Sequence, residues 1–152
     1  MRYHDERSPS RWIYRAAVVL ALFTGFGNMP LYGRYYIGDL PLLAWSGDFL
    51  ANVKVHYVAG AILVAMGVYY LITYFRGYAR RQLTAMGRLR ALLLALTLLS
   101  GLVMALKNLP GVFFPMGLLM SMNFLHMGAA VFFMLASLGA LVLRAGWLRW
   151  AR

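Results

Sequence analysis

The sequence predicts an all-α membrane protein, a bundle of four transmembrane helices. Of its 152 residues, 62% are hydrophobic and only 12% are charged, about half the charged fraction of a typical soluble domain. Residues 16–33, 55–75 and 108–143 contain no Asp, Glu, Lys or Arg, and neither does the slightly shorter run 91–106. Runs of this kind indicate membrane-spanning helices, whereas a transmembrane β-barrel would show short alternating segments. We therefore expect a single membrane domain over residues 1–152, which excludes a soluble enzyme and a disordered chain.

The first two predicted helices cover about residues 12–31 and 49–75. The first follows a polar, basic stretch, and its exit reads GFGNMPLYGRYY. A secretory signal peptide would end at a small-x-small cleavage site. Because this exit holds no such site, we expect the first helix to be retained as a membrane span.

The third and fourth predicted helices cover about residues 91–109 and 116–143. The uncharged stretch 108–143 is too long for one perpendicular span. It opens with NLPGVFFPMG, and Pro and Gly at this density favour a turn. We therefore expect a short turn between the two helices.

The basic residues divide unevenly between the two ends of the spans. Twelve flank one end: Arg2, Arg7, Arg11, Arg15, Arg76, Arg80, Arg81, Arg88, Arg90, Arg144, Arg149 and Arg152. Three flank the other end: Arg34, Lys54 and Lys107. The positive-inside rule then places both termini and the loop 76–90 in the cytoplasm, as in a multi-pass protein of a bacterial-type inner (plasma) membrane. The same rule accounts for the net charge of +11 without a nucleic-acid partner, for which no basic face is evident.

The outer loop, residues 32–48, is the most distinctive polar segment. It is aromatic and amphipathic, and it holds the two acids of the outer side, Asp39 and Asp48. One interpretation is a segment lying on the bilayer surface. The other is a docking surface for a partner subunit, or a lid over a site.

Two histidines fall in the apolar runs, His56 and His126, whereas His4 lies in the polar N-terminal stretch. Ionisable side chains in a bilayer are rare and usually functional. His56 precedes Arg76 by 20 residues and His126 precedes Arg144 by 18, which is about 30 and 27 Å of helix. Because the second and fourth helices run in the same direction, we expect both imidazoles at one depth, toward the outer side.

Two imidazoles at one depth on two helices are what a bis-histidine b-type haem requires. Each supplies one neutral nitrogen to the iron, on opposite faces of the porphyrin, and helix bundles commonly build cofactor sites in this way. We therefore expect one haem b, with His56 and His126 as axial ligands. Small residues nearby leave room for the macrocycle: Gly60, Gly128 and Ala130. Three basic residues of the outer side are candidate partners of the haem propionates, the alternative being solvated interfacial charge: Arg34, Lys54 and Lys107.

A structural role for the histidines is the main alternative. Each imidazole can simply hydrogen-bond to a neighbouring helix, and Ser121 and Asn123 are polar residues close to His126 in sequence. A zinc or copper site is disfavoured, because two nitrogens without Cys, Asp or Glu in the spans form a poor coordination set. The chain has no cysteine, which also excludes covalently attached c-type haem and an iron–sulfur cluster held by this chain.

The strings around these histidines resemble a known family. They read KVHYVAGAILVAMGVYY around His56 and NFLHMGAAVFFMLASLGALVL around His126, with Thr24–Gly25 in the first helix and Ser100–Gly101 in the third. This pattern resembles the four-helix cytochrome b (gamma) subunits of membrane formate dehydrogenases and nickel–iron hydrogenases. The resemblance covers roughly residues 11–143 and implies a partner subunit of the iron–sulfur, molybdenum or hydrogenase type.

The sequence departs from that family at the inner haem. Family members typically carry a second haem, held by a first-helix histidine before Trp and by a histidine two heptads after the first fourth-helix ligand. Arg11 and Ala140 occupy those positions here. The resemblance therefore implies only the outer haem, and it leaves the place of a quinone site open.

The expected function is that of a membrane electron-transfer subunit, which links a partner redox subunit to the quinone pool of a respiratory chain. Such a subunit is part of an oxidoreductase and need not be an enzyme by itself. One alternative is a haem-free anchor, with or without a quinone site, for a multisubunit oxidoreductase. Another is a small transporter or channel, which the absence of a carboxylate within the spans disfavours.

Overall fold

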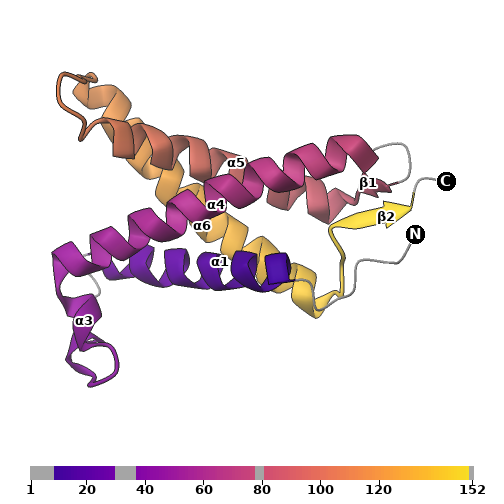
Figure 1. The fold of residues 1–152 in the computed structure, drawn as a ribbon, viewed down its shortest axis with the longest axis horizontal. Helices are drawn as coiled ribbons and strands as arrows, with labels where there is room; N and C mark the ends of the chain where they lie inside the picture. The colour runs from indigo at the N-terminus through magenta and orange to yellow at the C-terminus, as the bar shows by residue number, and fades with distance from the viewer. Residues whose placement is uncertain (1–8, 30–36, 78–80, 151–152) are drawn as a thin grey trace. The chain divides into compact units, whose positions relative to one another are not determined.

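The computed structural model describes residues 9–29, 37–77 and 81–150. Its elements, in chain order, are α1 (Pro9–Gly27), η1 (Ile37–Asp39), α3 (Ala44–Gly47), α4 (Phe49–Gly77), β1 (Arg81–Leu83), α5 (Ala85–Leu106), α6 (Met116–Val142) and β2 (Leu148–Trp150) (Figure 1). The chain forms two compact units, residues 1–68 and 69–152. Helix α4 begins in the first unit and ends in the second.

Among the described residues, three helices are long and apolar enough to cross a membrane: α4 with 29 residues, α5 with 22 and α6 with 27. Large apolar side chains on them are exposed, among them Leu99 on α5 and Phe132 and Leu141 on α6. A helix that carries apolar residues on its outer face as well as on its packed face suits a lipid environment. The chain is therefore a multi-pass membrane protein. Helix α1, with 19 residues and with Arg11 and Arg15 in its first half, is not among these three and stays the predicted fourth span.

Helix α4 starts where the sequence predicted, because Asp48 caps it. The Asp48 carboxylate accepts hydrogen bonds from the backbone N–H groups of Leu50 (2.8 Å) and Ala51 (3.1 Å), which would otherwise lack partners at a helix start. One of the two acids of the outer loop thus has a structural role. In the same loop, the Trp45 ring of α3 lies 6.0 Å from the Phe23 ring of α1, centroid to centroid.

The segment 76–90, predicted to be a loop, is helical at both of its ends, which corrects the sequence interpretation. Helix α4 continues to Gly77, and α5 begins at Ala85, six residues before the predicted start. Thr84 sets this start, because its hydroxyl oxygen accepts a hydrogen bond from the Gly87 N–H at 2.8 Å, as an N-cap residue does. Two helices also end earlier than the sequence predicted. Helix α1 ends at Gly27 and not at residue 31, and α5 ends at Leu106 and not at residue 109.

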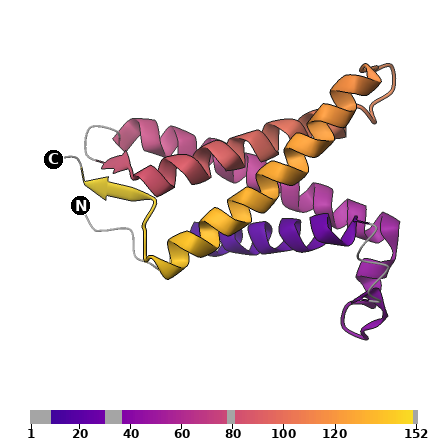
Figure 2. The same cartoon turned by 180° about the vertical axis from the view of Figure 1, so that it is seen from behind.

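A tight turn leads from α5 into α6, as the sequence predicted. Pro110 and Gly111 occupy its centre, Gly111 has a φ of +76°, and the Val112 N–H donates to the Leu109 carbonyl at 3.2 Å. A proline followed by a residue of positive φ is the signature of a type II turn. Helix α6 then starts at Met116, and Figures 1 and 2 show α5 and α6 packed together as a hairpin.

The segment after α6 folds back onto the start of α5, an arrangement the sequence did not predict. Strands β1 and β2 pair antiparallel, with Gln82 opposite Arg149. Thr84 donates its hydroxyl hydrogen to the Gly146 carbonyl at 2.8 Å. The buried Arg90 donates to the Ala145 carbonyl at 3.1 Å, and its guanidinium lies 4.2 Å from the centroid of the Trp147 ring. These contacts hold residues 145–150 in place.

Gly87→Ala is expected to displace this returning segment. A Cβ atom at Gly87 would overlap the backbone carbonyl of Trp147, and a backbone atom cannot yield as a flexible side chain can. We expect a loss of about 1–3 kcal/mol in unfolding free energy and faster proteolysis near residue 147. Thermal unfolding and limited proteolysis in detergent measure the two effects. Gly117→Ala is the matched control, since a Cβ there meets no atom within 4 Å; equal losses in both variants would contradict the expectation.

Candidate functional site

His56 lies on the second turn of α4 and contacts α1 through its Nδ1 atom. This nitrogen is 3.0 Å from the Thr24 hydroxyl oxygen. The hydroxyl hydrogen of Thr24 is already donated to the Leu20 carbonyl at 2.7 Å. Since a hydroxyl carries one hydrogen, Thr24 accepts the bond from His56, and Nδ1 is the donor. The neutral imidazole then carries its lone pair on Nε2.

His126 reaches the same tautomer by a different bond. Its Nδ1 atom lies 2.9 Å from the Thr97 backbone carbonyl on α5, and a carbonyl oxygen can only accept. The Ser100 hydroxyl lies 3.4 Å from the same nitrogen and donates its own hydrogen to the Leu96 carbonyl at 2.6 Å. His126 therefore donates from Nδ1 and, when neutral, also carries its lone pair on Nε2.

A glycine beside each hydroxyl residue gives the imidazole its place against the facing helix. A Cβ at Gly25 would lie 3.2 Å from the His56 Cε1 atom, and a Cβ at Gly101 only 2.8 Å from the His126 Cε1 atom. Each unit therefore contains the same arrangement, in which a hydroxyl–glycine pair on one helix faces a histidine on a second helix. Thr24 and Ser100 are almost fully buried, at 0% and 1% exposure, so each hydroxyl lies within the packing of its own unit.

An asparagine one turn before His56 joins α4 to the end of α1. Asn52 is fully buried, and its amide donates to the Thr24 carbonyl at 2.9 Å and to the Asn28 side-chain oxygen at 2.8 Å. Gly27 makes room for it, since a Cβ there would lie 2.9 Å from the Asn52 nitrogen. Thr24 is thereby held through its backbone while its hydroxyl orients His56.

The other predicted site residues are placed as follows. A Cβ at Gly60 or at Gly128 would meet no atom within 4 Å, so both positions border open space. Ala130 is half-buried, and Lys54 and Lys107 are exposed. Arg34 lies outside the described residues.

Two residues bear on alternatives considered from the sequence. Ser121, a candidate partner of His126, donates its hydroxyl to the Gly117 carbonyl of its own helix at 2.9 Å. Ala140, at the position of the second fourth-helix ligand in the resembled family, is buried at 2% exposure. Sequence reasoning missed Thr97 and Asn52 as site residues. The hydroxyl–glycine pairs were visible in the sequence, but the helix face that they occupy was not.

Thr24→Val is expected to loosen the hold on His56. Valine keeps the shape of threonine but removes the oxygen that accepts the Nδ1 hydrogen, and loss of such a supporting bond typically weakens metal ligation by about 10–100-fold. For the haem expected from the sequence, this would mean lower occupancy and a changed midpoint potential, which reduced-minus-oxidised spectroscopy and redox titration measure. Thr73→Val is the control, because the Thr73 hydroxyl bonds to the Tyr69 carbonyl of its own helix. Equal occupancy and potential in both variants would speak against the assigned role of Thr24.

Comparison of the chain with models of protein families, with curated proteins and with solved structures gives no match. The function is therefore argued from the residues and contacts described above.

Proposed function

We propose that this multi-pass membrane protein is an electron-transfer subunit that binds one b-type haem through His56 and His126. The observation that carries the proposal is the common tautomer of the two histidines. In each, Nδ1 donates to an acceptor on the facing helix of the same unit, which gives Nε2 the lone pair. Histidine ligands of metals usually hold the second nitrogen in this way, which fixes the tautomer and the ring orientation.

The residues around the histidines fit a haem. Thr24 and the Thr97 carbonyl orient the rings, and Gly25 and Gly101 let each ring approach its facing helix. Gly60, one turn after His56, borders open space, which suits a flat, apolar macrocycle. Lys54 and Lys107 are exposed and available to propionate groups. The matched separations of His56 and His126 from the basic flank support one haem held by both.

The chain's part in electron transfer is ligation, orientation and burial. A bound haem accepts and donates one electron at a time, so no residue of this chain needs to break a substrate bond. The resemblance to cytochrome b subunits supports an outer partner of the iron–sulfur, molybdenum or hydrogenase type and the quinone pool as the second redox partner. The loop 32–48 is the proposed docking segment for the partner subunit, and the positive-inside pattern supports a bacterial-type inner membrane.

A reduced-minus-oxidised absorption spectrum of the purified protein tests the proposal, with a pyridine haemochrome assay for stoichiometry. We expect a b-type α band and about one haem per chain, from one pair of imidazoles. About two haems would contradict the single site. A folded protein, expressed with sufficient haem but colourless, would overturn the proposal and favour the haem-free anchor, in which the same hydrogen bonds join helices only.

A further inference from the structure

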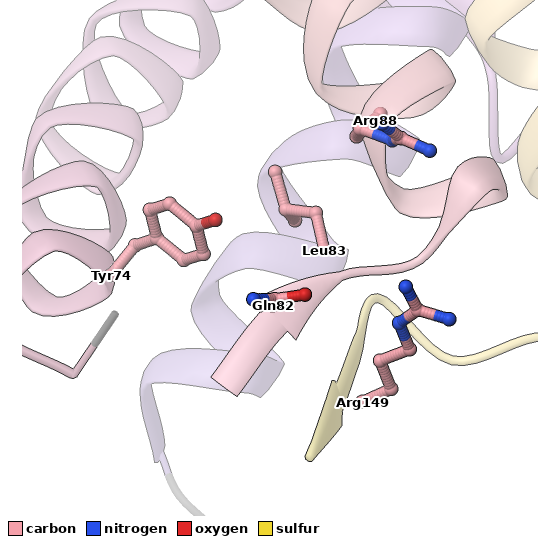
Figure 3. Close-up of a pocket in the computed structure, with 5 residues that line it drawn as sticks. All are labelled: Tyr74, Gln82, Leu83, Arg88 and Arg149. Atoms are coloured by element: carbon pink, nitrogen blue, oxygen red, sulfur yellow. The ribbon is translucent and has the colours of Figure 1, made fainter. Parts of the chain in front are cut away.

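A pocket of about 160 Å³ lies in the second unit, at the end where the returning segment meets α5. Its walls come from four elements: Tyr74 of α4, Gln82 and Leu83 of β1, Arg88 of α5 and Arg149 of β2. Figure 3 shows the Arg149 guanidinium extending toward the side on which Arg88 lies, with Gln82 between Tyr74 and Arg149. The pocket thus brings together two guanidinium groups, a phenol and an amide.

The fold fixes the backbones of the two arginines relative to one another. Arg149 is held by the pairing of β2 with β1, opposite Gln82. Arg88 lies on the first turn of α5, and its backbone N–H donates to the Thr84 backbone carbonyl at 2.8 Å. Thr84 in turn binds the returning segment through Gly146 and Trp147. The pocket is therefore built by tertiary contacts between segments about 60 residues apart, and it does not depend on one flexible loop.

The charges of the second unit are not balanced within it. Residues 69–152 contain no Asp or Glu and nine basic residues: Arg76, Arg80, Arg81, Arg88, Arg90, Lys107, Arg144, Arg149 and Arg152. Arg88 and Arg149 are exposed, and the carboxylates of the sequence all lie before residue 49. No acidic side chain of this unit can therefore neutralise the pair.

The position of the pocket indicates the source of a neutralising anion. Tyr74 lies three residues before the end of α4, and Arg88 lies three residues after the start of α5. Both helices are long enough to span a membrane, so their ends lie at the level of the lipid headgroups. Basic pockets between such helix ends bind anionic lipid headgroups, and guanidinium groups match the paired oxygens of a phosphate.

We propose that the pocket lined by Tyr74, Gln82, Arg88 and Arg149 binds the phosphate of an anionic phospholipid headgroup. Arg88 and Arg149 supply the charge and the paired donors, while Tyr74 and Gln82 add polar groups that can hydrogen-bond to phosphate oxygens or to the headgroup alcohol. This inference does not involve His56 or His126 and is independent of the proposed haem.

Lipid retention by the full-length protein in a nonionic detergent tests the inference. The probes are dioleoylphosphatidylglycerol, which is anionic, and dioleoylphosphatidylcholine, which is zwitterionic, each titrated and counted by native mass spectrometry. We expect selective retention of phosphatidylglycerol and a higher unfolding temperature in its presence. The double variant Arg88→Gln/Arg149→Gln is expected to bind it roughly thirtyfold more weakly, as the loss of two surface charges predicts.

The matched control is Arg76→Gln/Arg144→Gln, which removes the same charge from exposed positions of the same unit outside the pocket lining. We expect it to keep most of the phosphatidylglycerol binding. Equal loss in both double variants would overturn the pocket in favour of diffuse surface charge. Equal retention of the two lipids would overturn the requirement for a net negative headgroup.

Inorganic phosphate separates the lipid from a free anion. If millimolar phosphate alone raised the unfolding temperature as much as phosphatidylglycerol does, the lipid assignment would be wrong. If the double Gln variant does not fold, Arg88→Lys/Arg149→Lys replaces it in the titration. Lysine keeps the charge but lacks the planar pair of donors, so we expect partial loss of affinity. Unchanged affinity in that variant would contradict direct phosphate contact by the guanidinium groups.

Discussion

Replacing His126 with asparagine is expected to abolish haem binding while leaving the helix contact in place. The asparagine amide can occupy the position of the imidazole Nδ1 and donate to the Thr97 carbonyl, which lies 2.9 Å from Nδ1 in the structure. It offers no aromatic nitrogen to iron. Because a bis-histidine haem needs one imidazole on each face, we expect the loss to exceed the roughly 10–100-fold typical of losing only a supporting hydrogen bond, so that no b-type spectrum remains.

The histidine substitutions are most informative as a set. His56→Ala and His126→Ala are both expected to remove the b-type spectrum, whereas His4→Ala, outside the spans, is expected to leave about one haem per chain. The pyridine haemochrome assay measures each, and circular dichroism reports whether the helices persist. Full haem content in His126→Asn would show that His126 serves only to join α5 and α6. That result would return the site to the structural alternative.

Gly101→Ala is expected to impair the site from the facing helix. The added Cβ would lie 2.8 Å from His126 Cε1 and 3.1 Å from Nδ1, so the ring must move away from α5 and from the Thr97 carbonyl that orients it. We expect a loss of about 1–3 kcal/mol in stability together with lower haem occupancy. Gly25→Ala places its Cβ 3.2 Å from His56 Cε1. We expect smaller losses of stability and of haem occupancy in this variant.

Gly139→Ala serves as the control for both glycine variants. A Cβ at Gly139 meets no atom within 4 Å. Gly139 lies in the last turn of α6, and replacing a helical glycine with alanine stabilises a helix by up to about 0.5–1 kcal/mol. Thermal unfolding and haem stoichiometry measured on the three variants should therefore rank Gly101→Ala lowest and Gly139→Ala highest. Full occupancy with an unchanged midpoint potential in Gly101→Ala would contradict the close approach of the ring to α5.

Both units hold a histidine against a hydroxyl–glycine pair of a facing helix, and this shared arrangement bears on the role of the two histidines. A histidine whose only role was to hydrogen-bond one helix to another could donate from either ring nitrogen. Here Thr24 and the Thr97 carbonyl both select Nδ1 as the donor. A common choice of nitrogen at two sites is expected if both rings must present Nε2 to one metal. The haem substitutions above test this interpretation directly.

Much of the helical framework could be predicted from the sequence. The starts of α4 and α6 match the predicted residues 49 and 116, because a capping aspartate and a Pro–Gly turn mark them locally. The start of α5 was placed six residues late. Thr84 was the true cap, and the charges of Arg88 and Arg90 concealed the helix that it begins. Arg90 is buried against Trp147, a distant residue whose contact no local pattern indicates.

The candidate site was predictable only in part. His56 and His126 were visible because an ionisable side chain in an apolar run is costly and therefore conspicuous. Thr24 and Ser100 were visible only as neighbours of glycines. The Thr97 carbonyl could not be predicted at all, since every residue has one.

The sequence by itself determined the class of the protein, the spans of α4 and α6, and the two membrane histidines. These depend on the length and polarity of single segments, which act before any helix meets another. The tertiary structure decided which nitrogen of each histidine donates, which glycines face the rings and how Arg88 and Arg149 come to share a pocket. Thr24 and His56 are 32 residues apart, and Ser100 and His126 are 26 apart. Such residues meet only when helices pack, and the packing selects one face of each helix in a way that no local property of the chain specifies.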